Sequence, residues 1–246
     1  MTDPLYGHRA KIGLVIPSNN TVIEPELWAM RPAGVTVHGN RILAKGNTPE
    51  GIVEMEKSAS RAVAELKHGR MSVIVYACLA TSLVKGPGWT REVERRIAAD
   101  AGCPATTAAT ATLEALRALG VRRVAIASPY PDQIQALLPG YIAEFGLDLV
   151  STRNLGINNS LELWKIPGIE VRAFARAVDV PQAEALCIVA TDLPTVGEIA
   201  KLESELGKPV VTTNQAILWK ALALAGIGEP IHGFGILLSQ SREAMQ

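Results

Sequence analysis

Two stretches far apart in the chain follow the same plan, and this repeat constrains the fold more than any other feature. Residues 102–119 contain GCPATT followed by ATLEALRAL, and residues 207–224 contain GKPVVT followed by AILWKALAL. By itself the likeness is what any two αβ units would show. Other apolar runs pair in the same order, however: residues 12–17 with 124–129, and residues 73–78 with 185–190. The repeat therefore predicts two similar lobes, each a small α/β unit.

Short apolar runs rich in Val and Ile alternate with longer amphipathic stretches. The expected strands are residues 12–16, 73–76, 124–127, 185–189 and 210–211, with a possible further strand at 35–37. The expected helices are residues 51–66, 91–101, 112–119, 133–144 and 196–206. Strands that are apolar on both faces and take turns with helices are typical of parallel sheets covered by helices. We therefore expect an α/β fold with mostly parallel sheets.

Composition excludes several classes of partner. The 246 residues include 24 basic and 24 acidic side chains, and this balance argues against a nucleic-acid or anionic membrane surface. No apolar run approaches the length of a membrane span. The three cysteines have no metal-ligand spacing and the chain begins without a secretory signal, which predicts a cytoplasmic protein with free thiols. The histidines are too dispersed for a metal site, and no glycine-rich phosphate loop indicates a nucleotide.

The residues directly after each expected strand are where a ligand should bind, because parallel α/β sheets bind ligands beyond the carboxyl ends of their strands. These segments read PSNNT, CLATS, SPY, ATD and TTN, at residues 17–21, 78–82, 128–130, 190–192 and 212–214. They are rich in small, hydroxylated and amide side chains. Together with backbone N–H groups, such side chains suit a carboxylate-binding pocket.

Cys78 is the one thiol in these segments. A buried cysteine near a strand end is commonly a small apolar residue. Cys78, however, follows a strand and precedes an expected helix, whose free N–H groups would stabilise a thiolate. No histidine lies nearby in the sequence, so activation would come from amide dipoles or from side chains that the fold brings in. Cys103 precedes a strand and Cys187 lies within one, and we interpret both as structural.

The other candidate site residues allow a functional and a structural interpretation. The two asparagines in PSNNT are more than a helix cap requires and favour ligand contact, whereas Glu24 and Glu26 fit an interaction with a helix N-terminus. Arg41, close to His38, suits either a substrate carboxylate or a surface ion pair. Tyr130 either packs under its turn or directs its hydroxyl into the cleft.

Four motifs along nearly the whole chain resemble those of a known family. They are PSNNTVIEPE, VIVYACLATSL, ALGVRRVAIASPY, and ATDLPTVGEI with GKPVVTTNQA. They resemble the maleate cis–trans isomerase and arylmalonate decarboxylase branch of the aspartate/glutamate racemase superfamily. YACL and PSxNT look closer to the isomerase, since the decarboxylase has glycine at the position of Cys78.

The resemblance implies two pseudo-symmetric flavodoxin-like lobes, an active site in the cleft between them and no cofactor. We expect an N-terminal lobe of residues 1–115 plus 220–246 and a C-terminal lobe of residues 116–219. The resemblance also implies a small dicarboxylate substrate and favours a homodimer.

The resemblance also assigns roles to individual residues. Cys78 matches the nucleophile, Asn20 a carboxylate-binding asparagine, and Tyr130 a tyrosine that hydrogen-bonds the substrate carboxylate. The N–H groups of Leu79 and Ala80 would line the same carboxylate site. The remaining expected substrate-binding residues are Ser18, Thr191, Thr213, Asn214, and Ser160 or its neighbour Asn159, which fall where the family has a second asparagine.

One position departs from the family at the centre of the site. A second catalytic cysteine is expected at position 190, and the residue there is Ala190. Either the alanine was introduced to trap a substrate, or it is natural and the chain uses one thiol or none. The expected activity is cofactor-independent isomerisation of maleate to fumarate through Cys78, impaired by Ala190. The alternatives are a single-thiol relative that acts on another small acid, for example in ectoine or N-heterocycle breakdown, and a non-catalytic dicarboxylate binder.

Overall fold

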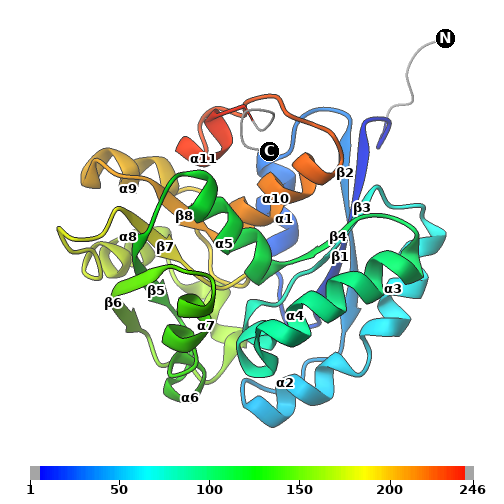
Figure 1. The fold of residues 1–246 in the computed structure, drawn as a ribbon, viewed down its shortest axis with the longest axis horizontal. Helices are drawn as coiled ribbons and strands as arrows, with labels where there is room; N and C mark the ends of the chain where they lie inside the picture. Colours follow the sequence, from blue (N-terminus) through cyan, green and yellow to red (C-terminus); the bar gives the residue numbers. More distant parts are fainter. Residues whose placement is uncertain (1–5, 242–246) are drawn as a thin grey trace.

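Two four-stranded sheets organise the protein, whose computed structural model describes residues 6–241 (Figure 1). The first sheet has the order β2-β1-β3-β4, with β1 (Ala10–Pro17), β2 (Val35–Ile42), β3 (Val73–Tyr76) and β4 (Ala105–Thr107). The second has the order β6-β5-β7-β8, with β5 (Arg123–Ser128), β6 (Asp148–Asn154), β7 (Ala185–Ile188) and β8 (Val210–Thr212). Every strand pair is parallel. The prediction of two similar parallel α/β lobes is confirmed.

The central strands are those that the apolar runs predict. All residues of β3 and β7 are buried, because helices cover both faces of each sheet. The three strands without a continuous apolar run, β2, β4 and β6, lie at sheet edges. β6 reads DLVSTRN and is only partly buried, and β2 becomes more exposed after Val37. An edge strand has solvent on one side, so it does not need an apolar run, and β6 escaped the sequence prediction for this reason.

The helices surround the two sheets and fill the space between them. They are α1 (Ile23–Met30), α2 (Pro49–Glu56), α3 (Ala59–His68), α4 (Leu79–Ala101), α5 (Ala108–Ala118), α6 (Asp132–Gln135), α7 (Leu138–Glu144), α8 (Gly168–Arg176), α9 (Ile199–Leu206), α10 (Thr213–Leu224) and α11 (Ile236–Ser239), with a 3₁₀ helix η1 (Ser160–Lys165). The single helices expected at 51–66 and 133–144 are each two helices. The expected helix at 91–101 is the second half of α4, which continues across a kink at Gly86, with φ 83°, followed by Pro87. Proline removes a helical hydrogen bond, so the sequence hid the first half of this helix.

Two equivalent helices, α5 and α10, join the lobes. Each follows the last strand of its own sheet and begins with a threonine N-cap, Thr107 and Thr212. The two helices pack against each other, and α10 also contacts β3 and β4 of the first sheet (Figure 1). One cluster of buried apolar side chains runs from β1 and β3 through these helices to β5, β7 and β8. The lobes therefore share a core, and the expected boundaries at 115/116 and 219/220 fall inside the joining helices.

Within residues 6–241, none of the helices combines the length and apolar composition needed to cross a bilayer.

Candidate functional site

A pocket opens at the carboxyl ends of the strands, where the two lobes face each other. It is lined by residues that follow β1, β2, β3, β5 and β7, and by apolar side chains from α2, α6 and the segment around η1. The residues that line the pocket are Pro17, Asn19, Ala44, Gly46, Asn47, Ile52, Met55, Cys78, Leu79, Ala80, Pro129, Tyr130, Pro131, Ile134, Ile157, Leu163, Thr191 and Asp192. The structure therefore brings together residues from both halves of the repeat, as the strand-end argument predicts.

Cys78 lies at the point where β3 gives way to α4. The strand ends at Tyr76, and Cys78 takes an extended conformation as the N-cap residue of α4. Only 8% of the residue is exposed. Burial raises the pKa of the Cys78 thiol above its usual range, and hydrogen bonding by Thr81 and by the N–H of Ala80 offsets part of this rise. The helix N-terminus thus stabilises a thiolate, but the resting form of Cys78 near neutral pH is the thiol.

Tyr130 lies on the same pocket wall, directly after β5. It is 8% exposed, and its backbone is held in place because Asn154 donates a hydrogen bond of 2.9 Å to the Tyr130 carbonyl. Burial raises the pKa of the Tyr130 hydroxyl well above its usual range. The hydroxyl is therefore a neutral hydrogen-bond donor at every physiological pH.

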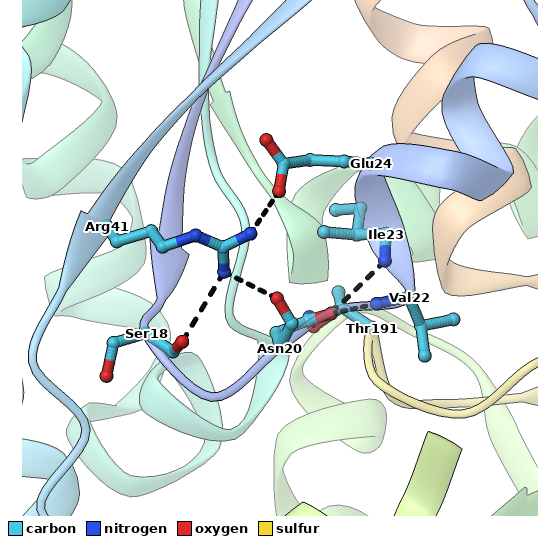
Figure 2. A network of polar contacts seen from close by, with 7 residues as sticks. All are labelled: Ser18, Asn20, Val22, Ile23, Glu24, Arg41 and Thr191. Carbon is cyan, nitrogen blue, oxygen red and sulfur yellow. Dashed lines mark hydrogen bonds and ion pairs between the residues drawn. The ribbon is translucent and has the colours of Figure 1, made fainter. Parts of the chain in front are cut away.

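The two asparagines after β1 have different surroundings. Asn19 lines the pocket, and its amide donates a hydrogen bond to the hydroxyl of Ser160. Asn20 is buried, and its Oδ1 accepts hydrogen bonds from the N–H groups of Val22 and Ile23 at 2.9 and 3.1 Å, so it caps α1 (Figure 2). Of these two asparagines, the one that lines the pocket is Asn19.

Asn20 also ties the two lobes together. Its Nδ2 donates to Thr191 Oγ1 at 2.9 Å. Arg41 fixes the same turn by donating to the carbonyl of Asn20 at 2.6 Å and by pairing with the carboxylate of Glu24 (Figure 2). Arg41 does not line the pocket. Of the two interpretations of Arg41, the structure shows the ion pair.

The loop after β7 carries Ala190, Thr191 and Asp192. Ala190 has φ 127°, a left-handed conformation that is unfavourable for a residue with a side chain, and its N–H donates to Thr213 Oγ1 at 3.3 Å. Thr191 Oγ1 donates to the carbonyl of Ala77 at 3.3 Å, so this loop touches the residue before Cys78. Asp192 lines the pocket, and burial raises its pKa to about 6.

Glu26 holds the far end of this loop. It lies on α1 and is 6% exposed. Its Oε1 accepts hydrogen bonds from the N–H groups of Thr195 and Val196 at 2.5 and 2.8 Å. Its Oε2 accepts from Asn214 Nδ2 at 2.7 Å and from Thr195 Oγ1 at 3.2 Å. Burial raises the pKa of Glu26, and these hydrogen bonds offset part of the rise.

The expected site residues thus fall into two groups. Cys78, Leu79, Ala80, Tyr130 and Thr191 line the pocket. The others stand behind its walls: Ser18 accepts a hydrogen bond from the N–H of Ala44, Asn159 caps η1, Ser160 accepts from Asn19, Asn214 donates to Thr191 and Glu26, Thr213 accepts from Ala190, and Asn20 binds Thr191.

Sequence reasoning missed Asp192 as a pocket residue and Glu26 as a buried link between the lobes. Asp192 was visible, because it stands four residues after the end of β7, in a segment already selected. Glu26 gave no signal, because a glutamate in the first turn of a helix is ordinary. Cys187 is buried in β7, where burial raises its pKa to about 12, and it does not line the pocket with Cys78.

Metal ligands and cations are not found at this site. Within residues 6–241, no group of three or more His, Cys, Asp or Glu is arranged to hold a metal ion. Among the described residues that line the pocket, none is Arg, Lys or His. An anionic ligand would therefore be held by backbone N–H groups, amides and hydroxyls rather than by a cation.

The sequence and the fold match one family over nearly their whole length. The arylmalonate decarboxylase family model matches residues 12–238. A maleate isomerase of Pseudomonas putida is 33% identical, and the match covers 93% of this chain and 97% of that protein.

Comparison of the fold with solved structures leads to the same family. A variant of the maleate isomerase of P. putida S16, solved with maleate, has a TM-score of 0.90 at 27% identity over 94% of this chain and 97% of that one. A variant of the Nocardia farcinica maleate cis–trans isomerase, with a covalently bound succinylcysteine intermediate, has a TM-score of 0.88 at 31% identity over 94% of this chain and 98% of that one. This chain belongs to the maleate isomerase and arylmalonate decarboxylase family.

Proposed function

We propose that the protein isomerises maleate, or a close cis-enedioate, to the trans isomer through covalent addition of Cys78. The observation that supports this most is the position of the sulfur. Cys78 stands at the N-terminus of α4, in a pocket that also holds Tyr130, Asn19 and the N–H groups of Leu79 and Ala80. A nucleophile and several neutral donors for a carboxylate thus share one small space.

The reaction needs the double bond of maleate to lose its π character before it can turn. The Cys78 thiolate adds to one vinylic carbon, and the electron pair of the double bond moves onto the other carbon and its carboxylate, which becomes enediolate-like. The remaining single bond rotates. The electron pair then re-forms the double bond as the carbon–sulfur bond breaks, and the trans acid leaves.

The donors on the pocket wall stabilise the charge that develops on the carboxylate. The N–H groups at the start of α4 have no partner within the helix, and the helix dipole adds to their attraction for an anion. The hydroxyl of Tyr130 and the amide of Asn19 complete a set of neutral donors. Such preorganised donors are worth several kcal/mol when they act on a forming oxyanion.

The apolar side chains of the pocket favour a second candidate function. Ile52, Met55, Ile134, Ile157 and Leu163 line the same pocket. These side chains would accommodate an apolar substituent on a small acid, as in an arylmalonate. The second candidate is therefore a single-thiol reaction, including decarboxylation, of a substituted malonate or a related acid.

Proton NMR separates the two candidates. Maleate and phenylmalonate would each be incubated with the unmodified protein, with Cys78→Ser and with Cys103→Ser as the matched thiol control. We expect the fumarate vinyl signal with the unmodified protein and with Cys103→Ser, but not with Cys78→Ser. Phenylacetate without fumarate would favour the second candidate, and neither product would refute both.

A further inference from the structure

The contact between Ala77 and Thr191 brings two reactive side chains from opposite lobes into one pocket. Thr191 Oγ1 donates to the Ala77 carbonyl at 3.3 Å. Cys78 follows Ala77, and Asp192 follows Thr191. Both Cys78 and Asp192 line the pocket. The negative charge of Asp192 contributes to the raised pKa of both Cys78 and Tyr130.

Asp192 is held in this position from several sides. Thr191 also accepts a hydrogen bond from Asn20 at 2.9 Å, and its carbonyl accepts one from Asn214 at 3.1 Å. Glu26 binds the other end of the same loop through the N–H groups of Thr195 and Val196. The backbone on both sides of Asp192 is thus held by hydrogen bonds.

The protonation states of Cys78 and Asp192 allow a proton to pass from the thiol to the carboxylate. Among the described residues that line the pocket, the titratable ones are Cys78, Tyr130 and Asp192. The pKa of Asp192 is about 6, whereas those of Cys78 and Tyr130 are raised above their usual ranges. Near neutral pH, Asp192 is therefore a carboxylate and Cys78 a thiol, which is the resting state that a base and its nucleophile require.

We propose that Asp192 is the proton carrier of the reaction: it takes the proton of the Cys78 thiol and delivers it to the substrate carbon next to the one that the sulfur attacks. This role rests on the proposed function. It supplies from the second lobe the acid–base group that Ala190 cannot supply.

Each step balances. As the S–C bond forms, the S–H proton passes to Asp192, and the π electrons move to the neighbouring carbon, which becomes enediolate-like. The Asp192 carboxylic acid then gives this proton to that carbon, and the product is a succinyl thioether on Cys78 with Asp192 again a carboxylate. After the C–C bond has rotated, Asp192 removes a proton from the same carbon, the double bond re-forms, and the C–S bond breaks. The leaving sulfur recovers a proton from Asp192.

Removing the carboxylate of Asp192 should lower both turnover and KM, which separates the loss of a proton carrier from a general loosening of the pocket. In Asp192→Asn, the proton carrier is lost, so we expect fumarate formation to fall about 10²–10⁴-fold. KM for maleate should fall, since a like charge has left the pocket.

The experiment compares the unmodified protein, Asp192→Asn, Asp192→Glu and the exposed control Asp148→Asn. The kcat/KM profile of the unmodified protein should rise through a midpoint near pH 6, as Asp192 ionises. This rise should be absent from Asp192→Asn, retained in part by Asp192→Glu and unchanged in Asp148→Asn.

Two results would overturn the assignment while leaving the proposed function intact. One is full fumarate formation by Asp192→Asn with the unmodified pH profile. The other is slower turnover by Asp192→Asn with a pH midpoint that stays near 6, because a general loosening of the pocket would slow the reaction without removing the titrating group. A separate result, no fumarate from the unmodified protein, would refute the proposed function and the assignment with it.

Discussion

Removing the carboxylate of Glu26 should destabilise the protein far more than neutralising it. Glu26 accepts four hydrogen bonds from the second lobe, two from backbone N–H groups and two from the side chains of Thr195 and Asn214. In Glu26→Ala these buried donors lose their acceptor. Each unsatisfied donor costs about 1–3 kcal/mol, and partial relaxation reduces the sum. We expect a loss of about 3–5 kcal/mol, less than the sum over four unsatisfied donors because the surroundings relax.

Glu26→Gln should cost only about 1–2 kcal/mol. The remaining oxygen of the new side chain can still accept from Thr195 and Val196. Its new NH₂ group would face the amide of Asn214, whose Oδ1 has no hydrogen-bond partner among the described residues. That amide can turn over and accept a hydrogen bond from the introduced glutamine, at the expense of its bond to Thr191.

The pH dependence provides an independent check. Because burial raises the pKa of Glu26, its stabilising contribution is complete below the pKa of the unfolded chain and is lost as the pH rises through the folded value. Glutamine does not titrate. The deficit of Glu26→Gln relative to the unmodified protein should therefore be largest at acid pH and smaller above neutrality.

Urea unfolding at several pH values measures these differences, with the exposed Glu144→Ala as the matched control. For a chain of this size, a loss of 3–5 kcal/mol corresponds to a fall in Tm of about 6–20 °C. If Glu26→Ala were as stable as the control, or if Glu26→Gln were as damaging as Glu26→Ala, the buried hydrogen-bond network would not contribute as described.

Three further predictions concern the same region. Ala190→Gly should stabilise the protein by about 1 kcal/mol in urea unfolding, because glycine adopts φ 127° without strain and this gain exceeds its entropic cost; a loss of stability would contradict the strained conformation. Asp192→Asn should raise the free energy of unfolding by about 1–3 kcal/mol at pH 8 but not at pH 4. The pKa of Asp192 is raised to about 6, so its buried carboxylate is ionised and destabilises the folded protein only above that pH. Equal effects at both pH values would contradict this prediction. Cys187→Ser should lower the free energy of unfolding by about 1–3 kcal/mol, since it buries a hydroxyl in the apolar interior of β7, yet it should leave alkylation of Cys78 unchanged; faster or slower alkylation would show that Cys187 belongs to the site.

The sequence predicts the architecture well because the architecture is repeated. A parallel strand buried on both faces must be apolar throughout, as in β3 and β7, and two copies of the same order argue against chance agreement. The edge strand β6 and helix α8 were missed. β6 carries polar residues because one side of it meets solvent.

The candidate site was predictable in part. The strand-end rule selects Cys78, Tyr130 and Thr191 from short-range information alone, because parallel strands present their carboxyl ends together. The role of each neighbour depends on side-chain direction, and sequence does not give this. Asn19 and Asn20 are adjacent in the chain, yet the first lines the pocket and the second caps α1.

The parts of the site that the sequence did not predict depend on contacts between residues that are far apart in the chain. Glu26 and Thr195 are far apart in the sequence, and the contact between them exists only once both lobes have folded and docked. Cys78 and Asp192 likewise line one pocket only when both lobes have folded. A lone thiol and a lone carboxylate give no motif, and they become a candidate acid–base pair only through the Ala77–Thr191 contact.

The central claim is that Cys78 forms a covalent bond to a cis-enedioate, and the most direct measurement is the mass of the Cys78 peptide after brief incubation with maleate and acid quenching. We predict that the peptide gains the mass of one maleic acid, that Cys103 and Cys187 remain unmodified, and that fumarate competes for the same thiol. A Cys78 peptide of unchanged mass, under conditions in which the protein produces fumarate, would contradict the covalent mechanism.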